Sequence, residues 1–251
     1  MTAAWTLAER ELVRFFRQPN RVVGAVLQPL VFWLLFGAAF RGSFRPPAAG
    51  QTYQQFFLPG IATLIALFTA IFSTISILED RREGFLQGVL VAPVRRASLV
   101  LGKVLGGALL AVLQGTLFLL LAPFAGVALG PLALLGAAGV LFLVGFALTG
   151  LGFCLVWRMD SVQGFHAVMS VLLMPLWLLS GAFFPAAGLP GWLAWAIRLN
   201  PLTYGVEALR IALGLAPGPA APALGVTAAF GVATFLLACL LARRRTRVDL
   251  R

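Results

Sequence analysis

Long apolar runs without acidic or arginine residues recur along this chain. A helix that crosses the roughly 30 Å hydrocarbon core of a bilayer needs about 20 such residues. The composition points the same way, because 61% of the 251 residues are hydrophobic and only 11% are charged, whereas soluble domains have about 25% charged residues. The sequence therefore predicts an all-α polytopic membrane protein and excludes a water-soluble domain.

Six transmembrane helices are predicted, and together they form a single transmembrane domain over residues 1–251. They cover residues 22–40, 56–78, 99–124, 132–156, 164–184 and 221–242. None of them contains Arg, Asp or Glu, and Lys103 lies in the first turn of the third. A charge at the centre of a membrane helix costs a few kcal/mol or more, so charges collect in the loops.

The basic residues are distributed unevenly between the two sides of the predicted membrane domain. Fifteen of the 19 Lys and Arg residues fall at the amino terminus, after the second and fourth spans, and in the carboxyl-terminal tail. The other four fall on the opposite side. Because cytoplasmic loops carry the excess of Lys and Arg, both termini are predicted to be cytoplasmic.

Residues 1–21 are predicted to form an amphipathic interfacial helix. Arg10, Arg14, Arg17 and Arg21 follow one another at spacings of 4, 3 and 4 residues, which places them on one helical face. A helix of this kind lies in the headgroup plane. It serves either as a topology anchor or as a lever that transmits motion from a cytoplasmic partner.

The loop over residues 79–98 is charged and is interrupted by Gly and Pro. Phe85 and Val89, like Leu86 and Leu90, are four residues apart, so one side of a short helix is apolar. Pro93 disfavours helical geometry at the preceding residue and ends this helix. Because a simple helix connection needs only about 2–8 residues, the loop is interpreted as a docking element parallel to the membrane.

The segment 185–220 is predicted to lie on the outer face. Trp192 and Trp195 suit a membrane interface, and the helix around them is too short to cross. Irregular backbone at membrane depth must be buried in protein or line a cavity. Asn200 and Tyr204 are candidates to satisfy freed backbone groups there. The alternative is a loop that lies flat on the outer surface.

Two stretches resemble the ABC transporter type-2 permeases. The first is REGFLQGVLVAPVRRASLVLGK, residues 82–103, which is similar to the cytoplasmic loop of that family. The second is NPLTYGVEALR, residues 200–210, before the last span. The residues that match the loop pattern are Glu83, Gly84, Leu90, Pro93, Arg95, Gly102 and Lys103. Six spans and an amphipathic leader also fit, so the resemblance covers essentially the whole chain.

The resemblance implies a permease subunit of an exporter in the inner membrane of a bacterium. Its loop helix would be a coupling helix, seated in a groove of a separate ATPase subunit that is present in two copies and holds ATP and Mg. A second copy of the chain or a close homologue would complete the pathway, surrounded by membrane lipid and without nucleic acid. The coupling residues would be Glu83, Gly84, Phe85, Leu86, Val89, Leu90, Pro93 and Arg95.

By the same resemblance, the second and fifth spans would line the path of a hydrophobic or amphipathic cargo, such as a drug, a lipid or a lipid-linked glycan. Its lining residues would be Phe68, Phe72, Met169, Leu173 and Trp177, each of which also fits ordinary helix packing. Short re-entrant helices would seal the outer end, through Trp192, Trp195, Asn200, Pro201 and Tyr204.

No catalytic or metal-binding motif is apparent in the sequence. Gly102 and Lys103 are followed by Val104, so the G-x-x-x-x-G-K-[ST] loop for nucleotide binding is missing and ATP hydrolysis is expected from a partner. A single His rules out H-E-x-x-H, and no Cys or His cluster suggests a metal site. A stand-alone membrane carrier or membrane-embedded enzyme is the alternative, although no carboxylate pair lies within a span to favour it.

Overall fold

The computed structural model describes residues 2–17, 19–40, 42, 50–185 and 189–243, and for residues 2, 19–22, 25, 26 and 90 it describes the backbone alone. The described residues contain helices and no strand, so the predicted all-α fold is confirmed. The helices are α1 (Thr2–Phe16), α2 (Pro19–Ala39), α3 (Tyr53–Ser73), α4 (Ile75–Arg82), α5 (Phe85–Val91), α6 (Arg96–Leu119), the 3-10 turn η1 (Ala122–Ala125), α7 (Pro131–Val156), α8 (Val162–Leu178), α9 (Gly191–Leu199), α10 (Pro201–Ala212) and α11 (Ala221–Arg243).

Four stretches of the described chain are long and apolar enough to cross a membrane. They are α3 together with α4, then α6, α7 and α11. Shorter apolar stretches occupy Leu27–Ala39 of α2 and Val162–Leu178, which is α8. The chain is therefore a multi-pass membrane protein, and the count of six spans stays a prediction.

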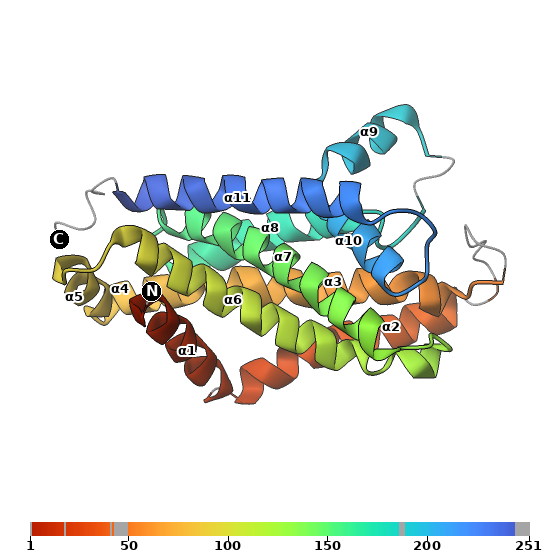
Figure 1. The fold of residues 1–251 in the computed structure, drawn as a ribbon, viewed down its shortest axis with the longest axis horizontal. Coiled ribbons are helices and arrows are strands. Elements are labelled where there is room, and N and C mark those ends of the chain that lie inside the picture. The colour runs from red at the N-terminus through yellow and green to blue at the C-terminus, as the bar shows by residue number, and fades with distance from the viewer. Residues whose placement is uncertain (1, 18, 41, 43–49, 186–188, 244–251) are drawn as a thin grey trace.

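The long helices run along the length of an elongated bundle, as Figure 1 shows. Helix α3 is the central one, because 83% of its most apolar window is buried, whereas for α11 the share is 22%. A helix that is apolar on all sides belongs inside a bundle or in lipid. The burial of α3 fits the first environment, and the exposure of α11 fits the second.

Helix α1 packs directly on α6. A Cβ atom added to Gly102 would lie 2.7 Å from Leu7 Cβ and 2.8 Å from the Ala4 carbonyl oxygen, and one added to Gly106 would lie 2.8 Å from Glu11 Cβ. Only glycine permits so close an approach of two helices. The predicted interfacial helix is therefore docked on the bundle, and one of its sides is buried against protein.

Helix boundaries differ from the predicted ranges at several points. Helix α1 ends at Phe16 and α2 begins at Pro19, which takes the first helical position, where its missing N–H is not needed. The second predicted span is interrupted at Thr74, which separates α3 from α4. Helix α8 ends at Leu178, earlier than the predicted end at residue 184.

Candidate functional site

The short helix α5 lies at one end of the bundle and contacts α4 (Figure 1). The start of α6 and the end of α11 lie at the same end, where Arg96 of α6 binds the Ala242 carbonyl oxygen of α11. We call this the α5 end, and the opposite end, which carries α9, the α9 end. Gly84 precedes α5 with a φ of 77°, a left-handed conformation that allows the sharp turn out of α4. On the other side, Ala92 is extended before Pro93, as the sequence predicts.

The residues predicted to couple to an ATPase divide into an inner and an outer set. Leu86 is buried, and Phe85 and Val89 are half-buried against the bundle. Glu83, Gly84, Pro93 and Arg95 are exposed, and the side chain of Leu90 lies outside the described part of the structure. Val91 is 86% exposed and points away from the bundle. Helix α5 is thus anchored by its apolar side, and its other side remains open.

A buried group of charges joins three helices behind α5. Lys103 Nζ of α6 donates to Glu11 Oε1 of α1 at 2.6 Å and to Ser76 Oγ of α4 at 3.1 Å. It also bonds the Asp80 carboxylate of α4. Lys103, Glu11 and Asp80 are each no more than 5% exposed. Charges buried this deeply persist only when they are paired, so these contacts fix α1 against α4 and α6.

Two arginines of α1 extend this group toward the surface. Arg10 forms a two-pronged contact with Asp80, at 2.8 and 3.1 Å, and its guanidinium lies 3.9 Å from the centre of the Phe85 ring. Arg14 contacts Asp80 at 3.0 Å, Glu79 at 2.9 Å and Glu83 at 3.4 Å. The hydrogen bond with Asp80 raises the pKa of Arg10, although burial opposes this shift.

We call Arg10, Glu11, Arg14, Glu79, Asp80, Glu83 and Lys103 the charge network. Sequence reasoning named only Glu83 among its members as a coupling residue. Asp80 and Glu11 were not found from the sequence, although a lysine inside an apolar helix is a signal that carboxylate partners exist. The network joins α1, α4 and α6, and through Arg10 it also contacts Phe85 of α5.

Two further arginines close the α5 end by binding the last carbonyl groups of other helices. Arg81 donates to the carbonyl oxygens of Trp157 at 3.2 Å and Met159 at 3.0 Å, where α7 ends. Arg96 donates to the Ala242 carbonyl oxygen at 2.6 Å, where α11 ends. Cationic side chains at helix C-termini satisfy free carbonyl groups and the helix dipole. Arg81 and Arg96 at this end thus contribute to packing between helices.

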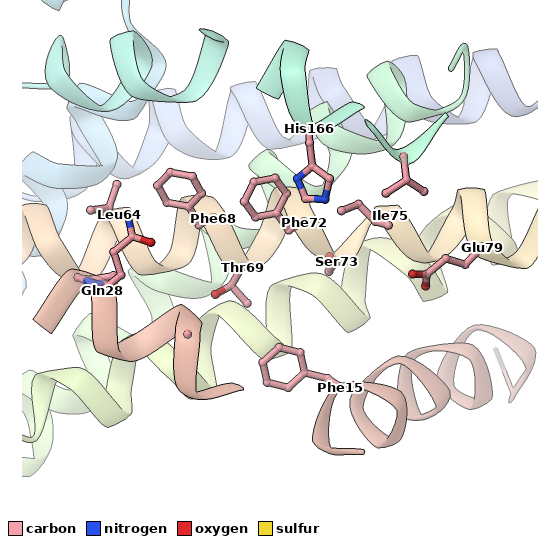
Figure 2. A pocket seen from close by; sticks show the side chains of 13 residues that line it. Phe15, Gln28, Leu64, Phe68, Thr69, Phe72, Ser73, Ile75, Glu79 and His166 are labelled. Atoms are coloured by element: carbon pink, nitrogen blue, oxygen red, sulfur yellow. The ribbon is translucent and has the colours of Figure 1, made fainter. Parts of the chain in front are cut away.

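A pocket of about 440 Å³ lies beside the charge network. Figure 2 shows that residues of α1, α2, α3, α4 and α8 form its wall. The predicted cargo residues Phe68 and Phe72 both line it, and the His166 ring lies 5.1 Å from that of Phe72. The lining residues are Phe15, Gly24, Gln28, Pro29, Leu64, Phe68, Thr69, Phe72, Ser73, Ile75, Glu79, Val162 and His166.

The other predicted cargo residues lie in the core of the bundle. Met169, Leu173 and Trp177 form the buried side of α8 and are no more than 2% exposed. Trp177 Nε1 donates to the Gly60 carbonyl oxygen at 2.8 Å, and its ring packs on Phe57. The structure therefore brings two of the five predicted residues to the pocket and places three on the buried side of α8, where Trp177 contacts α3.

The residues predicted to seal the outer end form two groups, one exposed on α9 and one where α9 meets α10. Trp192 and Trp195 are exposed on α9, which stands away from the bundle in Figure 1. Asn200 caps α10 and donates to the Leu176 carbonyl oxygen at 2.6 Å, Pro201 opens α10, and Tyr204 Oη donates to the Arg198 carbonyl oxygen at 3.0 Å. The last three residues fix the corner between α9 and α10.

Among the described residues, no group of three or more His, Cys, Asp or Glu side chains is placed to hold a metal ion. The structure does contain the charge network, which connects α1, α4 and α6, and the pocket beside it. Glu79 belongs to both, because it pairs with Arg14 and also lines the pocket. A displacement of α5 or α1 would therefore reach the pocket wall through directly contacting side chains.

The family model and the relatives that match this chain are all named as transporters, transport permeases or a nodulation protein. The model of the ABC-2 type transporter family matches residues 2–213. A putative transport permease, ycf38, of Cyanophora paradoxa is 32% identical over 82% of this chain and 72% of its own length. Nodulation protein J of Sinorhizobium fredii is 30% identical over 89% and 86%. The daunorubicin resistance ABC transporter permease protein DrrB1 of Streptomyces coeruleorubidus is 27% identical over 84% and 74%.

Proposed function

Because this chain belongs to the ABC-2 type transporter family, we propose that it is the membrane-spanning permease subunit of an ATP-binding-cassette exporter. Permeases of this family normally work with an ATPase subunit. Two copies of that subunit would hold ATP and Mg and would dock on α5. Two copies of this chain, or this chain and a close homologue, would enclose the path through the inner membrane of a bacterium.

The observation that carries the proposal is the continuous contact from α5 to the pocket. Phe85 of α5 lies under Arg10, Arg10 binds Asp80, and Arg14 joins Asp80 to Glu79 in the pocket wall. A force applied to α5 would thus act on α1, α4 and the pocket together. The break at Thr74 between α3 and α4 gives this motion a place to bend.

The cargo is proposed to be hydrophobic or amphipathic, because apolar side chains, three phenylalanines among them, make up more than half of the described wall of the pocket. The names of two relatives mention daunorubicin resistance and nodulation. These names describe those proteins and do not identify the cargo of this chain. A drug-like, lipid or lipid-linked molecule is the cargo class that we propose here. It would move outward from the cytoplasm or the inner leaflet, with six spans per chain and both termini cytoplasmic.

A docking experiment tests the proposal. The tagged chain in lipid nanodiscs is purified together with the ATPase encoded beside it, and Val91→Arg is compared with the wild type. Val91 is exposed on α5, so its replacement should leave the fold intact and abolish capture of the ATPase. Gln163→Arg, at an exposed position where α8 begins, is the matched control and should retain capture.

Two results would count against an ATP-driven permease. Capture that is equally strong in Val91→Arg and in wild type would remove α5 from the docking site. If no ATPase binds and the chain alone transports or modifies a substrate in liposomes, the stand-alone carrier or membrane enzyme becomes the better assignment.

A further inference from the structure

One face of α11 carries a row of apolar side chains that ends in an arginine. Val232, Leu236 and Leu240 follow one another at intervals of four residues, and each is more than half exposed. Arg243 comes three residues after Leu240, on the same helical face, and it is exposed as well. An apolar face of this kind on a membrane helix borders lipid chains, and an arginine at its end reaches the headgroups.

The start of α6 brings two more arginines to the same place. Arg96 donates through Nη1 to the Ala242 carbonyl oxygen at 2.6 Å and to the Arg243 carbonyl oxygen at 3.4 Å. Arg95 precedes it as the N-cap residue of α6, and its side chain is exposed. Both helix ends lie at the α5 end in Figure 1. Three arginines from two distant parts of the sequence therefore meet where α6 begins and α11 ends.

These arginines have no carboxylate partner within the described part of the chain. None of the ion pairs between described residues includes Arg95, Arg96 or Arg243. Residues 244–251, which come next in the sequence, contain four Arg and one Asp, so they add further positive charge. Like charges gathered without an acidic partner create a positive potential that attracts an anion.

We propose that the start of α6 and the end of α11 together bind one anionic phospholipid. Its phosphate accepts hydrogen bonds from Arg95 and Arg243, and one acyl chain lies along Val232, Leu236 and Leu240. A zwitterionic lipid has the same phosphate but also an ammonium group, which the arginines repel. A bound anionic lipid holds α6 to α11 at this end. The proposal concerns a lipid of the surrounding membrane and is independent of the cargo and of ATPase capture by α5.

Photolabelling of the full chain in nanodiscs tests the proposal. Phosphatidylglycerol and phosphatidylcholine probes with the same diazirine in one acyl chain are each added as a minor component of phosphatidylcholine nanodiscs, and mass spectrometry identifies the labelled residues. We expect the phosphatidylglycerol probe to label residues 232–243 at least about fivefold more than the phosphatidylcholine probe, the scale of one basic residue at an anionic headgroup. Leu113 and Leu117, which are exposed on α6, are the internal control and should be labelled equally by both probes.

Three variants assign the lipid preference to the arginines. Arg243→Gln should lower the ratio of phosphatidylglycerol to phosphatidylcholine labelling at residues 232–243 about threefold. Arg243→Lys keeps the charge and should retain most of the ratio. Arg82→Gln removes an exposed charge of α4 at the same end of the bundle and should leave the ratio unchanged. Since both probes are compared on the same variant, the ratio does not depend on how much of the sample is folded.

Three results would overturn the proposal. They are equal labelling of residues 232–243 by the two probes, a phosphatidylglycerol preference that survives Arg243→Gln, and a preference that falls as far in Arg82→Gln as in Arg243→Gln, which would reflect net charge alone. Soluble glycerol 3-phosphate in excess should not displace the phosphatidylglycerol probe, because it has no chain to cover the apolar row. Displacement would identify the site as one for free phosphates and would rule out the lipid.

Discussion

Lys103 occupies a place in α6 that an isolated apolar helix would not tolerate. It is 3% exposed, and its ammonium group is stable there because Glu11 and Asp80 approach from two other helices. The cost of burying one unpaired charge is several kcal/mol. Gly102 beside it has a complementary role, since it lets α1 come close enough for Glu11 to reach the ammonium group.

Lys103→Met is expected to lower the free energy of unfolding by about 3–5 kcal/mol, because it removes the cation nearest to the buried Glu11 and one of the three cations that contact Asp80. Unfolding in mixed detergent and sodium dodecyl sulfate, followed by tryptophan fluorescence, measures the change. Arg158→Met, at an exposed position of the same end, is the control and should change stability by less than about 0.5 kcal/mol. A stability of Lys103→Met equal to that of wild type would mean that the buried pairing contributes nothing.

At the scale of elements, α5 combines a short length with a firm attachment. Seven residues are too few for a helix that is stable on its own. It is held by Leu86 in the core, by Phe85 under Arg10 and by the turn at Gly84. This attachment lets its exposed side act as a rigid surface for a partner.

Gly84→Ala should loosen α5, because an L-residue in the left-handed conformation costs roughly 1–2 kcal/mol. Hydrogen–deuterium exchange of the amides of residues 85–91 should become faster. Gly88→Ala is the matched control: its added Cβ would meet nothing within 4 Å, and its φ is not positive. That variant should exchange at the wild-type rate or more slowly, since Ala is the better helix former. Identical exchange in both variants would show that the turn does not anchor α5.

At the scale of the whole molecule, α8 is covered by protein on one side only. Phe165, Met169, Leu173 and Trp177 are buried at four-residue intervals, while Val171 on its other side is 77% exposed. Helix α8 also supplies part of the pocket wall, through Val162 and His166. This arrangement suits a path completed by a second chain that packs against α8.

A cysteine at position 171 tests for that second chain. In a background with Cys154→Ala and Cys239→Ala, Val171→Cys in membranes should form a covalent dimer with a short bifunctional maleimide. Val232→Cys is the control, because Val232 is also exposed but lies on α11. Equal dimer yields from both positions, or none from position 171, would argue against α8 as the meeting surface.

The sequence by itself determined the helical class, the apolar stretches of the long helices and the short helix that Pro93 ends. These features depend on local properties, since apolar length and helix-breaking residues act within one segment. The roles predicted for α5 in coupling and for Trp192 and Trp195 at the outer end stay predictions.

The tertiary structure alone decided which charges and rings meet. Glu11 and Lys103 are 92 positions apart, and the helical spacing of Arg10 and Arg14 fits a face toward lipid headgroups as well as one toward the protein. Because α1 docks on Gly102 and Gly106, Arg10 and Arg14 face the protein. Likewise, Phe72 and Trp177 are both aromatic residues within apolar spans, and the sequence predicts that both line the path. Only Phe72 lines the pocket, because the register of α8 on α3 turns Trp177 toward Gly60. Packing between distant segments is a property of the whole chain, which no single segment encodes.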